Sequence, residues 1–251
     1  MYSVTQRIKA IKQPRGGYIK PKEFSETALN DGLELNPSEN IHASLVGLAV
    51  DYLTRFMTGT PALQAFYISL LGSERVKERK NAEKLISKIK GLDDNSIVNA
   101  CKVVGYDVCF RAGTMGFKPV REIQPDSETI ENIRIMVNRC LAFWEIYGPV
   151  IVDGFTFEGG YTSIVSAGDG DYLTEDTLWD LKVSREPLKN KYTLQLLMYY
   201  IMGCHSVHKE FQNIKKLGVF NPRLNIVYLL DIANISDEII REVSVEVIGY
   251  E

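Results

Sequence analysis

The residues best suited to chemistry lie in the stretch GDGDYLTEDTLWDLKVS, residues 168–184. Its apolar residues and the polar turn at 174–177 predict a β-hairpin. Residues two apart on a strand share a face, so Asp180 and Lys182 project together, and the hairpin places Asp171 opposite Asp180. Two converging carboxylates repel each other unless a hard cation such as Mg²⁺ or Mn²⁺ lies between them. A lysine beside that metal would orient or deprotonate a water, or stabilise charge on a phosphate.

The same residues also have a purely structural interpretation. Asp180 and Lys182 could form a surface ion pair on an edge strand, and Asp169 and Asp171 could be turn residues. A second signal is therefore needed to favour chemistry.

That signal comes from the next apolar segment, KYTLQLLMYYIMGC, which predicts a helix with Gln195 and Tyr199 on one face. The order G-x-x-D, then D-x-K with a nearby serine, then Q-x-x-x-Y resembles the PD-(D/E)XK nuclease superfamily. The closest branch is that of the RecB nuclease domain and the CRISPR adaptation exonucleases. The matching positions are Gly168–Asp171, Asp180–Lys182 with Ser184, and Gln195–Tyr199. The resemblance covers residues 149–232.

This resemblance implies a Mg²⁺- or Mn²⁺-dependent deoxyribonuclease that hydrolyses phosphodiester bonds. Asp171, Asp180 and the backbone carbonyl of Leu181 would bind the metal, and Lys182 would be the catalytic lysine. Gln195 and Tyr199 would contact the nucleic-acid strand or brace the metal ligands. The residues leave open whether the substrate is DNA or RNA, its strandedness, and whether cutting begins at an end.

Members of the family often add a metal ligand from an upstream helix, a histidine in the pattern G-x-x-x-H. Here Gly47 is followed four residues later by Asp51, so the resemblance makes Asp51 the expected third ligand, with His42 or Glu39 as substitutes. The rival interpretation of Asp51 is an ion pair with Arg55, one helical turn away.

Basic residues cluster near the motif and at the start of the chain. The segment 185–191 follows the expected catalytic strand with Arg185, Lys189 and Lys191, and it could guide phosphates or be a solvated loop. Arg223, which follows later, could reach a phosphate or belong to a turn. Residues 1–22 contain six basic residues and no acid, although the net charge of the chain is -3. Such a patch can follow a phosphate backbone even on an acidic protein.

Periodicity predicts helices in the first half and a mixed β-sheet in the second. Asn36–Glu39 has the residue types of a helix start, and further helices fit 61–71, 74–90, 95–110 and 126–148. Strands fit 150–157, 161–167, 171–173, 177–183 and 224–232, and a last helix should begin after Ser236. The expected fold is α/β, a mixed sheet flanked by helices with a restriction-endonuclease-like core. The chain, 1–251, would be one nuclease domain with a helical insertion at 60–147 and a motif-bearing core at 149–232.

Composition narrows the function classes. The apolar runs are too short to cross a bilayer and the start of the chain lacks the apolar core of a signal peptide, so a cytoplasmic protein without a membrane partner is expected. Four scattered cysteines with no C-x-x-C pair argue against a zinc site or an iron–sulfur cluster. A homo-oligomer is compatible with the resemblance. The alternative function is a nuclease-fold module with a weak metal site that binds nucleic acid or a protein. A third possibility is a different metal hydrolase with two carboxylates, in which Gln195 and Tyr199 would have no role.

Overall fold

The structure is a computed structural model that describes residues 1–251 and divides into two compact units. We call residues 1–29 and 144–251 the sheet unit and residues 30–143 the helical unit. The segment 149–232 lies within the sheet unit. The helical unit differs from the expected insertion at 60–147, because it begins at Asn30 and so includes the helix that carries Asp51.

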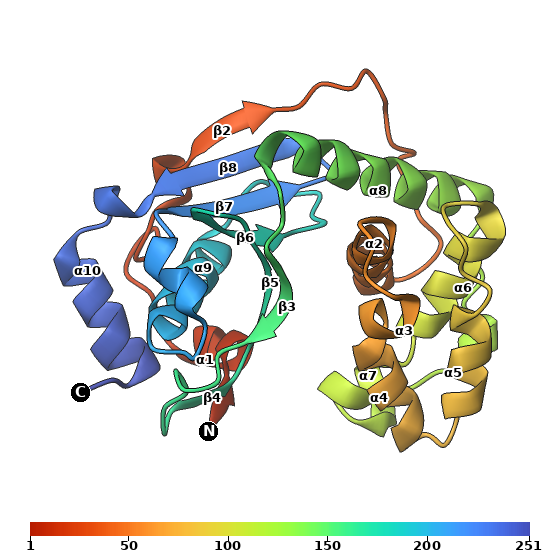
Figure 1. Ribbon diagram of the computed structural model, residues 1–251, viewed down its shortest axis with the longest axis horizontal. Coiled ribbons are helices and arrows are strands. Elements are labelled where there is room, and N and C mark those ends of the chain that lie inside the picture. The colour runs from red at the N-terminus through yellow and green to blue at the C-terminus, as the bar shows by residue number, and fades with distance from the viewer. The chain divides into compact units, whose positions relative to one another are not determined.

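The sheet unit is built on a six-stranded mixed sheet, which confirms the predicted α/β fold class. The strand order is β2-β8-β7-β6-β5-β3 (Figure 1). The strands are β2 (Ser25–Ala28), β3 (Val152–Thr156), β5 (Asp169–Leu173), β6 (Thr177–Leu181), β7 (Lys216–Asn221) and β8 (Ile226–Asp231). Within this six-stranded sheet, β6 and β7 are the only neighbours that pair in parallel. A separate pair, β1 (Tyr2–Ser3) and β4 (Val165–Ala167), is also parallel. Two sheet strands, β2 and most of β7, lie outside the segments predicted as strands.

Helix α9 (Asn190–Cys204) is the crossover between the parallel strands β6 and β7. Parallel neighbours need such a long connection, and a helix packed on the sheet is its usual form. Leu194, Leu197 and Met198 of α9 are fully buried in one core with Leu178 of β6 and Leu217 of β7. The apolar face of α9 thereby fixes which face of β6 points toward this helix.

Shorter helices complete the sheet unit. They are α1 (Val4–Ala10), α10 (Asp237–Glu242), the π-helix Val243–Ile248, and the 3₁₀ turns Pro21–Glu23, Lys209–Asn213 and Ile232–Asn234. The C-terminal helix begins after Ser236, as predicted, because the Ser236 hydroxyl accepts a hydrogen bond from the Ile239 amide at 3.3 Å.

The opposite face of the hairpin is covered by aromatic side chains. Trp144 and Tyr147, in the last turn of helix α8 (Ser127–Tyr147), pack on Tyr172 and Trp179 at ring-centroid distances of 4.9 to 6.4 Å. Because Trp179 points to this side, its neighbour Asp180 points to the α9 side.

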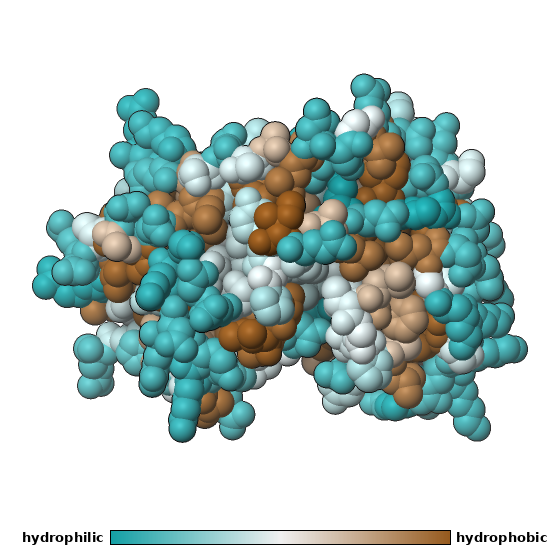
Figure 2. Space-filling view, turned by 45° about the horizontal axis from the view of Figure 1, so that its top comes forward, coloured by the Kyte–Doolittle hydropathy of each residue, from teal (hydrophilic) through white to brown (hydrophobic).

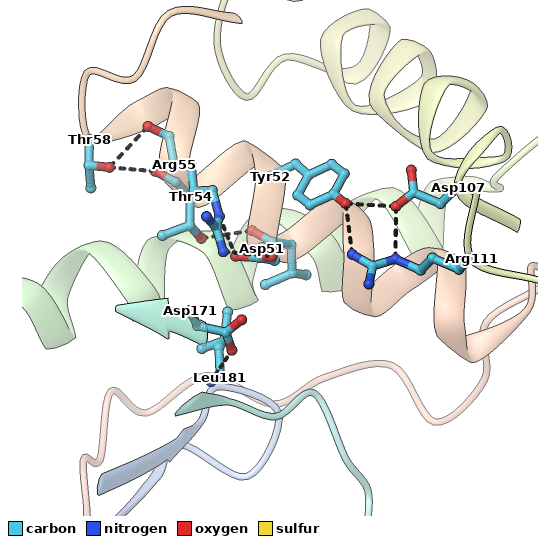
Figure 3. A network of polar contacts seen from close by, with 10 residues as sticks. Asp51, Tyr52, Thr54, Arg55, Thr58, Asp107, Arg111, Asp171 and Leu181 are labelled. Atoms are coloured by element: carbon cyan, nitrogen blue, oxygen red, sulfur yellow. Dashed lines mark hydrogen bonds and ion pairs between the residues drawn. The ribbon is translucent and has the colours of Figure 1, made fainter. Parts of the chain in front are cut away.

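The helical unit contains α2 (Ala43–Met57), α3 (Ala62–Ala65), α4 (Tyr67–Arg75), α5 (Arg79–Ile86), α6 (Asp94–Val104), α7 (Asp107–Arg111), the 3₁₀ turns Thr114–Gly116 and Val120–Glu122, and α8 as far as Phe143. Asp107, 1% exposed, bonds to side chains of two other helices, and its contact with Tyr52 is drawn in Figure 3. Its carboxylate accepts hydrogen bonds from the hydroxyls of Tyr52, at 2.6 Å, and Ser69. Burial raises the pKa of Asp107, although these hydrogen bonds and Arg111 oppose the rise.

The predicted helix start at 36–39 is wrong. Helix α2 begins at Ala43, and His42 is its N-cap. The Asn36 amide donates instead to the Asn132 side chain at 2.7 Å, and Asn132 also donates to Glu39 at 3.2 Å. Asn132, from α8, is buried, so its polar atoms need these partners. A contact with a distant helix thus replaced a local cap. The predicted helix at 74–90 is also interrupted, at Lys77, where φ is 62°.

No helix combines the length and the apolar character that a bilayer span requires. On the face shown in Figure 2, brown apolar areas are separated by teal and pale residues. The exposed large apolar side chains come from many different elements, among them Leu63, Met115 and Val245.

Candidate functional site

The hairpin β5–β6 brings the two predicted acids together. Tyr172 pairs with Trp179 and Leu173 with Leu178, so the same register places Asp171 opposite Asp180. At this point the backbone ladder ends, and a side chain takes the place of the next backbone acceptor: Asp171 Oδ2 accepts a hydrogen bond from the Leu181 amide at 2.9 Å (Figure 3). This bond holds the Asp171 carboxylate against the end of β6.

Lys182 lies immediately beyond β6, and its side chain returns to Asp180. Lys182 Nζ is 2.7 Å from Asp180 Oδ2. The Asp180 side chain is 3% exposed and that of Lys182 is 21% exposed, so a buried carboxylate is paired with a lysine of which only a part reaches solvent. The Lys182 amide donates to the Phe220 carbonyl at 3.0 Å, which extends the pairing with β7 by one residue and fixes the direction of the side chain.

The charge on Lys182 is stabilised by its surroundings. Burial lowers its pKa, but the carboxylates of Asp180 and Asp171 outweigh burial and raise the pKa above the ordinary lysine value of 10.5. The side chain therefore carries a positive charge at neutral pH. It is suited to stabilising negative charge on a phosphate and not to removing a proton from water.

This raised pKa makes a testable contribution to stability. Folded Lys182 holds its proton more tightly than the unfolded chain does, so its contribution is fully present below pH 10.5 and is lost as the pH rises through the folded pKa. We expect the difference in unfolding free energy between the native chain and Lys182→Gln to be constant from neutral pH to about pH 10 and to shrink above it. Urea denaturation at stepped pH values measures this difference. A difference that stays constant into the strongly alkaline range would contradict the raised pKa.

Gln195 and Tyr199 lie on helix α9, which packs on the sheet face to which the acids point. Gln195 Nε2 donates a hydrogen bond to the Tyr199 hydroxyl at 2.7 Å, and both residues are buried. Burial raises the pKa of Tyr199 well above its ordinary value, and the carboxylates of Asp169, Asp180 and Asp171 raise it further. Tyr199 is thus a neutral phenol within electrostatic reach of the acid pair. Such buried positions favour bracing of the acids over contact with a nucleic-acid strand.

Two further residues shape the site, although neither is among the predicted site residues. The Tyr192 ring lies between two ammonium groups, with its centroid 5.2 Å from Lys182 Nζ and 4.6 Å from Lys191 Nζ. Asn221, 2% exposed, donates from Nδ2 to the Ser184 carbonyl at 2.8 Å and so fixes the chain after Lys182. Tyr192 could have been predicted, because it lies three residues before Gln195 and so shares its helix face. The bond between Asn221 and Ser184 could not, because no sequence pattern links residues 37 positions apart.

Tyr192 and Asn221 line a shallow hollow beside Lys182, partly open to solvent, with a cavity volume of about 10 Å³. Its walls include Ser184, Leu188, Tyr192, Asn221 and Tyr228.

The four predicted phosphate-binding residues have different settings. Arg185 and Lys191 are exposed. Lys189, 41% exposed, forms an ion pair with Glu186. Arg223 is half-buried, and its backbone amide donates to Asn221 Oδ1 at 3.0 Å. Three of the four therefore flank the start of α9, and the fourth belongs to the turn between β7 and β8.

The expected third metal ligand and its substitutes all lie in the helical unit, where each has a local partner. Asp51 Oδ1 is 3.0 Å from Arg55 Nε, the ion pair that the sequence offers as its rival role (Figure 3). Glu39 accepts from Asn132, and the His42 ring accepts from the Ser44 amide at 3.2 Å. No group of three or more His, Cys, Asp or Glu side chains is arranged to hold a metal.

The acid pair by itself nevertheless fits one class of metal. Mg²⁺ is commonly bound by one or two carboxylates, with water and substrate phosphates completing its octahedron. Asp171 and Asp180 provide two hard oxygen donors on adjacent strands, one of them aligned by the Leu181 amide. The donor set therefore suits Mg²⁺ or Mn²⁺ in the presence of a phosphate substrate.

Comparison with known proteins adds no further guidance. Neither a protein-family model, nor a curated protein, nor a solved structure matches the chain. The function is therefore argued from the groups in the site.

Proposed function

We propose that this protein is a metal-dependent nuclease of the PD-(D/E)XK type that hydrolyses DNA phosphodiester bonds. One observation carries the proposal: two carboxylates and a charged, partly exposed lysine meet where β6 ends beside the first half of β5, and a buried Gln–Tyr pair lies on the neighbouring helix α9. A structural ion pair on an edge strand needs neither the second carboxylate nor the pair on α9. Moreover, β6 is a central strand of the sheet, between β7 and β5.

The roles of the residues follow from their contacts. Asp171 and Asp180 would hold Mg²⁺ or Mn²⁺, with the Leu181 carbonyl as a further donor; the bound ion would act as a Lewis acid on the phosphate and lower the pKa of a bound water. Lys182 would offset the charge that builds on the phosphate as water attacks. Gln195 and Tyr199 would hold the acids in place from behind. The water oxygen bonds to phosphorus while one P–O bond to a sugar breaks, which yields a phosphate monoester and a hydroxyl.

The test is a cleavage panel of linear, circular and single-stranded DNA, with RNA as a parallel arm, in Mn²⁺ or Mg²⁺. We expect cleavage of DNA that requires the divalent ion and stops on addition of EDTA. Cleavage that continues in EDTA would contradict the metal role. Binding of DNA with no cleavage under any divalent ion would instead favour the alternative, a nuclease-fold binding module.

A further inference from the structure

The basic N-terminal segment packs against the first turn of α9. A Cβ atom at Gly17 would lie 2.7 Å from Cβ of Asn190, so the two backbones approach as closely as a glycine allows. Two residues later, the Ile19 carbonyl accepts a hydrogen bond from the Thr193 hydroxyl at 2.7 Å. Helix α1, at the start of the same segment, also lies beside α9 (Figure 1). Residues 174 positions apart in sequence thus form one surface.

The first turn of α9 is itself electropositive. It contains no acid, and its N-cap, Lys189, makes no side-chain hydrogen bond to the helix amides. A helix N-terminus carries a partial positive charge, which here adds to the charges of the lysines. Arg15 and Lys20, which flank the Gly17–Ile19 contact, are both exposed.

We propose that Arg15, Lys20, Lys189 and Lys191 form one basic collar around the start of α9, and that the collar binds the phosphates of the DNA strand being cut. The proposal rests on the proposed function, since the bound strand is taken to be its substrate. The collar leads directly to the site, because Lys191 and Lys182 contact the same Tyr192 ring. A strand whose phosphates follow the collar would therefore present a phosphodiester to Lys182.

A nucleic-acid backbone fits the collar better than a protein partner does. The chain has a net charge of -3, yet residues 1–22 contain six basic residues and no acid. The acids that act electrostatically on this segment, Glu242 and Glu246, do so at Tyr18. Among the residues next to Lys189 the one acid is Glu186, which is paired with it. Several like charges held on a rigid helix end and a packed loop suit a regular polyanion, whose neutralisation also releases counterions.

The experiment compares two double charge reversals. Arg15→Glu with Lys20→Glu alters the collar, whereas Lys84→Glu with Lys88→Glu makes the same change at exposed lysines of the helical unit, on or just after α5. Binding of a single-stranded oligonucleotide is measured in EDTA, where no cleavage occurs, as a function of salt. We expect the collar variant to bind at least about tenfold more weakly at low salt and to lose about 1.4 from the slope of log K against log salt, for two phosphate contacts. The control pair should keep the native slope.

A third variant separates packing from charge. Gly17→Ala leaves every charge in place but forces the segment away from Asn190, because φ at Gly17 is 97° and its Cβ would be too close. We expect weakened binding under conditions in which circular dichroism shows the variant to be folded; its melting temperature is expected to fall as well, because alanine is strained at this φ. Collar variants that bind like the control pair overturn this proposal, even where the native protein cuts DNA. Collar-dependent binding without any cleavage overturns the nuclease function and leaves the collar as a DNA-binding surface.

Discussion

Replacing Lys182 by glutamine is expected to lower DNA cleavage by about 10²–10³-fold, the usual effect of removing one electrostatic group that stabilises a transition state. The ammonium of Lys182 lies 2.7 Å from Asp180 and also interacts electrostatically with Asp171. Glutamine keeps a hydrogen-bond donor toward the buried carboxylate, so the fold is less disturbed than with alanine. Single-turnover cleavage with saturating Mn²⁺ measures the loss in the chemical step.

The sheet supplies a matched control. Lys216, on β7, forms an ion pair with Asp176 at 2.8 Å, and both side chains are more than one-third exposed. Exposed pairs contribute about 0–1 kcal/mol to stability. Lys216→Gln should therefore leave both cleavage and melting temperature nearly native. Equal cleavage by the native chain and by Lys182→Gln, once matched for folded protein, would remove Lys182 from the mechanism.

Replacing either acid by asparagine is expected to abolish stabilisation by Mn²⁺ along with cleavage. Mn²⁺ at 100 times its dissociation constant should stabilise the native chain by about 2.7 kcal/mol, because an ion that binds only the folded state shifts unfolding by mass action. Asp171→Asn is the cleaner variant, since its side-chain oxygen can still accept the Leu181 amide. Thermal unfolding with and without Mn²⁺ measures binding of the ion independently of cleavage activity.

Two further variants test whether the loss of stabilisation by Mn²⁺ is confined to Asp171 and Asp180. Asp176→Asn changes an acid of the same hairpin turn, half of an exposed pair, and should retain the Mn²⁺ response. Asp51→Asn tests the third ligand: a reduced response would include Asp51 in the metal site, and a native response would leave Asp51 as the partner of Arg55. A native Mn²⁺ response in both Asp171→Asn and Asp180→Asn would remove the metal from this site.

Much of the candidate site could be predicted from sequence because its geometry is local. Asp171 and Asp180 are joined by one tight turn, and a two-residue period fixes which side chains share a face. Gln195 and Tyr199 are one helical turn apart, so their hydrogen bond follows from the helix alone. The apolar periodicity of α9 and the alternation in the hairpin likewise predicted these elements, because short-range backbone geometry sets both patterns.

The amino-acid sequence by itself determined the hairpin that pairs the acids, the helix that carries the Gln–Tyr pair, and the α/β class. Only the tertiary structure decided the features that depend on partners distant in sequence. Asn36 and Glu39 bond to the buried Asn132 and do not cap a helix. The backbone of β7 accepts the Lys182 amide and so directs its side chain. The N-terminal basic segment packs against the first turn of α9. The raised pKa of Lys182 also depends on tertiary structure, because burial lowers it and the carboxylates of Asp180 and Asp171 raise it. No period in a sequence encodes such contacts, because their energy comes from surfaces that meet only when the chain has folded.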